Sequence, residues 1–136
     1  MKISIQTDIQ KPIDVIWKTY ITPKHIDKWN HATDDWETVG SKSDFRVGGF
    51  FNYPMRAKDH SFGFEFEGEF LAIEPLKYIK YRILDDRIVE VKFTQKAKFV
   101  TVEVIFDAET ENSVELQKQG WQQILNSFKQ YVLTQN

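Results

Sequence analysis

Consecutive segments in which every second residue is apolar constrain this sequence more than any other feature. Five such segments follow one another, at residues 50–57, 63–73, 78–83, 88–93 and 99–106. Because side chains alternate between the two faces of a strand, each segment predicts a strand with one apolar and one polar face. Glu74-Pro75 and Asp85-Asp86 mark turns between them. The pattern therefore predicts an antiparallel sheet with a dry face and a wet face.

The C-terminal segment changes to the helical period. Apolar residues recur there at a spacing of about 3.6, namely at Trp121, Ile124, Leu125, Phe128, Tyr131 and Val132. At about 1.5 Å per residue this helix would run roughly 30 Å, enough to cross the whole sheet. Asn112, followed by Glu115 three residues later, resembles a capping box at its start.

The N-terminal segment completes the expected layout. Residues 2–9 alternate as a first strand, Pro12 begins a short helix, and Thr22-Pro23 begins a second one that Thr22 is expected to cap. No repeat or linker divides residues 1–136, which we interpret as a single domain. The expected fold is α+β, with a curved antiparallel sheet of about six to seven strands wrapped around the long C-terminal helix.

Composition excludes several classes of function. Lys plus Arg is 18 and Asp plus Glu is 20, so the chain lacks the basic excess that nucleic-acid binding requires. It contains no cysteine, which excludes disulfides and thiolate catalysis. Neither a signal peptide nor a membrane span is evident. We therefore expect a cytoplasmic protein that needs no cofactor.

The order of these elements resembles the helix-grip fold of the START/Bet v 1-like superfamily. Local sequences are similar to its branch called Activator of Hsp90 ATPase homologue 1-like (AHSA1-like), also labelled SRPBCC. The similar segments are PIDVIWKTYITPKHIDKW (12–29), DFRVGGFF (44–51), GFEFEGEFLAIEP (63–75) and SVELQKQGWQQILNSFKQYV (113–132). The resemblance covers nearly the full chain in the same order.

The resemblance implies three kinds of activity. Superfamily members bind lipids, sterols, polyketides or plant hormones in a cavity under the long helix. A few, of the polyketide cyclase and aromatase type, catalyse reactions there. The third activity is the activation of Hsp90 by the co-chaperone that names the branch. That protein carries this domain after a separate N-terminal domain, which we expect this chain to lack.

The stretch HIDKWNHATDDW, residues 25–36, gathers histidines, aspartates and tryptophans. On a helix Ile26 and Trp29 share one face and point inward, whereas His25 faces water. His25 and His31 are six residues apart, and a metal-binding pair on a helix needs a spacing of three or four, so we expect no metal site. Trp29 fits a packed core residue and a cavity wall about equally well.

Three further features have structural explanations. The alternating glutamates of residues 65–69 lie opposite the inward phenylalanines, so we expect them to pair with basic residues on neighbouring strands rather than act as catalytic acids. Gly48-Gly49 predicts a bend or bulge. Gly120 should cost its helix about 1 kcal/mol relative to Ala, and we expect close approach of the backbone to the sheet or to a ligand there.

The inward-facing residues define the candidate site. They are apolar apart from two phenols, and they include no nucleophile–base pair. We expect a ligand cavity lined by Trp29, Phe51, Tyr53, Met55, Phe66, Tyr81, Val91, Phe93, Trp121, Leu125 and Phe128. Phe64, Phe70 and Val102 belong to the same inward set.

The first functional hypothesis is the binding of a small hydrophobic molecule, such as a lipid, polyketide or aromatic compound, without catalysis. Tyr53 or Tyr81 would orient the ligand by hydrogen bonds. The second is an enzyme of the polyketide cyclase type that uses either tyrosine as an acid or positioning group. The third is a protein-interaction module like the co-chaperone domain.

Overall fold

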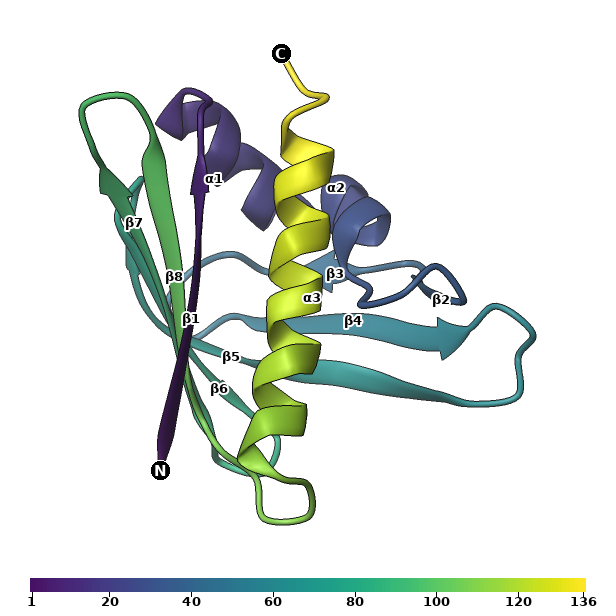
Figure 1. The fold of residues 1–136 in the computed structure, drawn as a ribbon. Coiled ribbons are helices and arrows are strands. Elements are labelled where there is room, and N and C mark those ends of the chain that lie inside the picture. Colours follow the sequence, from purple (N-terminus) through teal and green to yellow (C-terminus); the bar gives the residue numbers. More distant parts are fainter.

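The computed structural model describes residues 1–136 as three helices and eight strands (Figure 1). In chain order these are β1 (Lys2–Ile9), α1 (Ile13–Ile21), α2 (Pro23–Trp29), β2 (Trp36–Thr38), β3 (Lys42–Ser43), β4 (Phe50–Ala57), β5 (Gly63–Glu74), β6 (Tyr78–Ile83), β7 (Ile88–Gln95), β8 (Val100–Asp107) and α3 (Val114–Val132). None of the helices is both long and apolar enough to cross a membrane.

All strands join one antiparallel sheet in the order β1-β8-β7-β6-β5-β4-β2, with β3 paired to β4 beside this path. Six strands are long, whereas β2 and β3 have only three and two residues. The chain returns from β8 to pair with β1, so the first and last long strands are neighbours. The predicted antiparallel sheet is confirmed.

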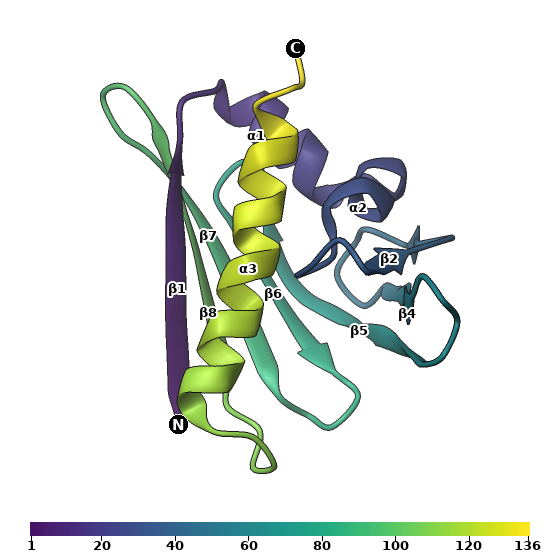
Figure 2. The same cartoon turned by 45° about the vertical axis from the view of Figure 1, so that its right-hand side comes forward.

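The sheet curls around α3, which crosses its concave side, and α1 and α2 cover one end (Figures 1 and 2). Helix α3 has 19 residues, so at about 1.5 Å per residue it spans almost 30 Å. Its residues Leu125, Phe128 and Val132 are buried against the sheet and the short helices. This arrangement confirms the predicted helix-grip fold.

A bulge changes the alternation within β5. Phe70 pairs with Tyr81, but Ala72 pairs with Lys80, so Leu71 is an extra residue in this strand. Unbroken alternation through residues 63–73 predicts that Ala72 faces inward with Phe70, and this prediction is wrong. Ile73 packs against the core instead. One inserted residue thus moves the rest of the strand to the opposite alternation.

The start of α3 also differs from the prediction. Ser113, not Asn112, is the N-cap residue, and its hydroxyl accepts a hydrogen bond of 3.1 Å from the backbone N–H of Leu116. Thr22 does occupy the N-cap position of α2, but its hydroxyl donates to the carbonyl of Lys18 instead of accepting from α2. The expected capping box is therefore replaced by a single serine cap.

The two glycine predictions have different outcomes. A turn occurs at Gly48-Gly49, where Gly48 has a φ of +85° and a Cβ on Gly49 would lie 2.0 Å from the carbonyl oxygen of Asp44. The close approach expected at Gly120 is absent, since a Cβ there would meet no atom within 4 Å. Gly120 lies one turn from Gln117 and Ile124 on the same face of α3, and the space beside it is open.

Candidate functional site

A cavity of about 320 Å³ lies between α3 and the concave face of the sheet. Most of its wall is aromatic and aliphatic. Seven of the predicted site residues line it, namely Trp29, Tyr53, Met55, Phe66, Tyr81, Trp121 and Leu125. Phe64 and Phe70, from the wider inward set, also lie on the wall.

The other four predicted residues, Phe51, Val91, Phe93 and Phe128, lie in the packed core instead of on the cavity wall. Phe93 is covered by α1, with its ring centroid 5.1 Å from that of Trp17 and 5.5 Å from that of Tyr20. Phe51 packs 5.1 Å from both Phe70 and Tyr81. Facing the concave side is therefore necessary but not sufficient for reaching the cavity, because the short helices fill one end of it.

Trp29 belongs to both the core and the cavity wall. Its indole N–H donates a hydrogen bond of 3.0 Å to the carbonyl of Thr19, and its ring packs 4.9 Å from Phe128. Its own carbonyl accepts a hydrogen bond of 2.7 Å from the hydroxyl of Ser127. These contacts hold the end of α2 against α3, so the position of this part of the wall is fixed by both helices.

Three phenols line the cavity: Tyr81 is buried, and Tyr20 and Tyr53 are partly buried. Burial raises the pKa of each one well above the usual tyrosine value of about 10, because an ionised phenolate would be poorly solvated there. The hydroxyls of Tyr20 and Tyr81 have no hydrogen-bond partner in the protein. At neutral pH all three are protonated and able to donate a hydrogen bond into the cavity.

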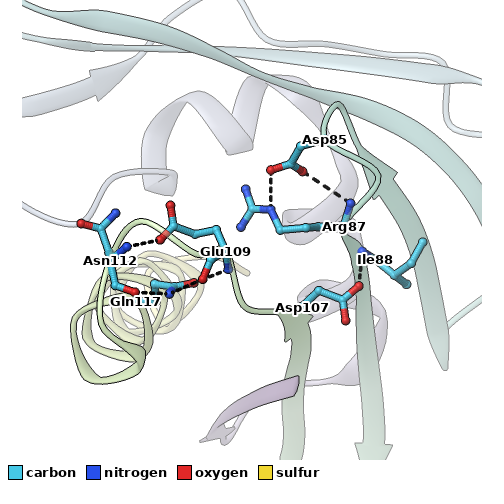
Figure 3. Close-up of polar contacts among 7 residues, drawn as sticks. All are labelled: Asp85, Arg87, Ile88, Asp107, Glu109, Asn112 and Gln117. Carbon is cyan, nitrogen blue, oxygen red and sulfur yellow. Dashed lines mark hydrogen bonds and ion pairs between the residues drawn. The ribbon is translucent and has the colours of Figure 1, made fainter. Parts of the chain in front are cut away.

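One end of the cavity is polar, and sequence reasoning missed it. Arg87 comes from the β6–β7 turn, and Glu109, Asn112 and Gln117 come from the β8–α3 loop and the first turn of α3 (Figure 3). Three of these residues lie in turns and loops, and Gln117 is a polar residue at a buried position one turn before Trp121, so apolar periodicity marks none of them. Ile124, also missed, belongs to the predicted apolar stripe of the C-terminal helix and could have been included. Tyr20 could have been found in the same way, because it follows Ile13, Ile16 and Trp17 at helical spacing.

Gln117 organises this polar end. Its side-chain oxygen accepts a hydrogen bond of 2.8 Å from the backbone N–H of Glu109, and its amide donates to the carbonyls of Glu109 at 3.2 Å and Asn112 at 2.9 Å. The Glu109 carboxylate accepts a hydrogen bond of 2.6 Å from the backbone N–H of Asn112. The β8–α3 loop is therefore held in one conformation beside the cavity (Figure 3).

The charged residues that the sequence singled out have structural contacts. The ring of His25 shares a hydrogen bond of 2.8 Å with the hydroxyl of Tyr131 on α3. Asp27 accepts hydrogen bonds from the backbone N–H groups of Gly40 and Ser41. No three His, Asp or Glu side chains are grouped so that they could hold a metal ion. On the convex face, Glu69 forms a 2.9 Å ion pair with Arg82 from the next strand.

Similar structures have been solved. A solution structure of an AHSA1-like protein from Aeromonas hydrophila is 41% identical, with a TM-score of 0.93 over 98% of this chain and 92% of that chain. A protein from Cytophaga hutchinsonii is 38% identical, with a TM-score of 0.85 over 96% of this chain and 90% of that one. A protein from Nitrosomonas europaea shares the fold at 14% identity, with a TM-score of 0.85 over 100% of this chain and 96% of that chain.

No curated protein matches the sequence. The family model for Activator of Hsp90 ATPase homolog 1-like protein matches residues 10–133, which include both short helices, seven of the eight strands and all of α3. This match and the relatives from Aeromonas and Cytophaga agree with the helix-grip architecture. The chain therefore belongs to the AHSA1-like family.

Proposed function

We propose that this protein binds a small, largely apolar molecule in the cavity between α3 and the sheet. The observation that carries the proposal is the cavity itself, with a volume of about 320 Å³ and a mostly aromatic and aliphatic wall. Ligand pockets typically measure about 300–1,000 Å³, so this one is at the small end of the range. A single flat ring system or a short aliphatic chain suits it better than a sterol.

The phenols support binding in preference to catalysis. Because burial raises the pKa of Tyr53 and Tyr81, each holds its proton at neutral pH and is a hydrogen-bond donor but a poor base. Such groups orient a ligand that carries an oxygen or nitrogen acceptor. The alternative of a polyketide cyclase-type activity would use the same phenols as acids or positioning groups, and replacing both with Phe would then abolish turnover.

The experiment is an NMR titration with naphthalene, decanol and cholesterol while the indole N–H signals of Trp29 and Trp121 are recorded. We expect saturable shifts with the first two compounds and none with cholesterol. Ile124→Trp provides a blocked variant, because Ile124 lines the cavity and a larger side chain there would occupy part of its volume. Ile124→Val is the matched control, since it keeps a smaller apolar side chain at the same position.

Binding should disappear in Ile124→Trp and persist in Ile124→Val. The absence of shifts in the wild-type spectrum with all three compounds would contradict the proposal. So would an Ile124→Trp variant that melts cooperatively and still binds as the wild type does.

A second candidate function is an interaction with Hsp90, which the family's name suggests. The observation in its favour is an exposed aromatic patch at the end of the β4–β5 hairpin, formed by Trp36, Phe62 and Phe64. The side chains of Phe62 and Phe64 are 64% and 48% exposed, and both rings lie within about 6.0 Å of Trp36. Apolar surface of this kind often marks a protein-binding site.

To test this candidate, the rate of ATP hydrolysis by purified Hsp90 is measured with and without the protein. Stimulation that is lost in a Phe62→Ser variant would support it. An unchanged rate, with no complex in gel filtration, would refute it. The result is independent of the titration above, because Phe62 does not line the cavity.

A further inference from the structure

The polar end of the cavity brings together side chains from two separate loops. Arg87 belongs to the β6–β7 turn, and Glu109 and Asn112 belong to the β8–α3 loop, yet all three line the same cavity. Figure 3 shows the guanidinium of Arg87 extending from its turn toward the loop that carries Glu109. A cavity that only stores apolar ligands would have no need of a guanidinium group in its wall.

Arg87 has hydrogen-bonding capacity that the protein does not use. Its Nε–H donates a hydrogen bond of 2.7 Å to Asp85, but the two terminal nitrogens of the guanidinium have no acceptor. Only 25% of the side chain is exposed, so much of the solvent that would otherwise satisfy these N–H groups is excluded. The remaining edge presents parallel N–H groups, which match the two oxygens of a carboxylate.

The facing loop does not satisfy Arg87 either. Glu109 and Arg87 form no ion pair, and the Glu109 carboxylate accepts instead from the backbone N–H of Asn112. Gln117 holds the backbone of this loop in place, and the Glu109 side chain would have to give up its bond to Asn112 before it could pair with Arg87. The side chain of Asn112 is directed away from Arg87 (Figure 3). The terminal nitrogens of Arg87 are therefore the donors that the polar end offers to an anion.

We propose that the ligand of this cavity is an apolar carboxylic acid, whose carboxylate binds the terminal nitrogens of Arg87. This inference rests on the proposed binding function and adds the chemical class of the ligand. The apolar body of the acid lies among the aromatic residues, and Tyr20, Tyr53 or Tyr81 can donate to an oxygen at its far end. The negative charge of Glu109 repels an anion that lies next to it. The ligand's carboxylate is therefore restricted to the terminal nitrogens of Arg87.

The test compares 2-naphthoic acid with 2-naphthalenemethanol, which has the same ring system and no charge, by calorimetry at pH 7. A charge-assisted hydrogen bond is worth about 1.5–3 kcal/mol, so the acid should bind the wild type at least about tenfold more tightly. Arg87→Gln should abolish this preference, because the affinity for the acid falls at least about tenfold more than the affinity for the alcohol. Arg87→Lys should retain part of it, and Glu109→Gln should strengthen the binding of the acid by removing a like charge.

Equal affinity of the wild type for the acid and the alcohol would overturn this inference while supporting the cavity as a binding site. A preference for the acid that survives in Arg87→Gln would also overturn it. Preferential binding of 2-naphthylmethylamine, lost in Glu109→Gln, would assign the polar end to a cation instead. If neither compound binds, the proposed binding function fails together with the inference.

Discussion

The indole of Trp121 stacks on the ring of Phe106, with 4.1 Å between the ring centroids and 11° between the ring planes. Phe106 is fully buried on β8, and Trp121 is the residue of α3 that closes the cavity at this point. The stacked pair is therefore the contact that sets how far α3 stands from the sheet. The ring of Trp121 also packs edge-on against Phe66, with 6.0 Å between the two ring centroids.

Trp121→Ala should lower the free energy of unfolding by about 3 kcal/mol, since both the buried area and the stacking are lost. Trp121→Phe should cost about 1 kcal/mol because an aromatic ring remains. Urea denaturation followed by circular dichroism measures both. Equal losses in the two variants would show that the stacking contributes nothing beyond the volume of the side chain.

Gly120→Ala should stabilise the protein by about 1 kcal/mol. A Cβ at this position meets no atom within 4 Å, so the gain in helix propensity is not opposed by a clash. A thermal melt would show the change as a rise in Tm. A decrease would mean that Gly120 is needed for a contact with the sheet or with a ligand.

Ser113→Ala should cost about 1 kcal/mol, because the backbone N–H of Leu116 loses its acceptor. Asn112→Ala should cost less, since the Asn112 side chain does not cap the helix. The two variants, compared in the same denaturation experiment, separate the observed cap from the one that the sequence suggested. A larger loss for Asn112→Ala would reverse this assignment.

The buried phenols should destabilise the fold in alkali. Tyr20, Tyr53 and Tyr81 have a raised pKa in the folded state, so above the unfolded value of about 10 the unfolded chain binds fewer protons than the folded one. Their contribution to stability is therefore complete below pH 10 and is lost as the pH rises through the folded pKa values.

An absorbance titration of the phenolates, run beside circular dichroism, checks this prediction. We expect these three tyrosines to ionise only as the protein unfolds, and Tyr81→Phe should make the alkaline loss of stability shallower. Ionisation of all five tyrosines near pH 10 with the fold intact would contradict the burial seen in the structure.

The long periodic segments were sufficient to predict the fold. Alternation in residues 88–93 and 99–106 placed Val91, Phe93 and Val102 on the buried face, where the structure has them. Alternation failed in β5 after Phe70, because the sequence does not mark Leu71 as an extra residue. A bulge of this kind depends on how strongly the sheet must bend around α3, which is a property of the assembled fold.

The candidate site could be predicted only in part. Phe51 and Tyr53 are on the same face of β4, yet Tyr53 reaches the cavity and Phe51 packs into the core. The two residues differ in burial because the sheet is curved and because other aromatic rings surround Phe51. The residue pattern of a single strand gives no information about either. Arg87 and Glu109 lie outside any periodic segment, so only their meeting in space reveals the polar end.

The two halves of α3 are attached to the protein unequally. The C-terminal half is buried through Phe128 and Val132 and is bonded to α2 through Ser127 and Tyr131. The N-terminal half contributes cavity wall and contains Gly120, which weakens the helix. Before Gly120 only Gln117 is buried, so local unfolding of residues 114–119 breaks its bonds to the β8–α3 loop but exposes little apolar surface. Amide hydrogen exchange should be fastest in this turn, and its opening would uncover the polar end of the cavity while Trp121 and the remainder of the helix stay in place.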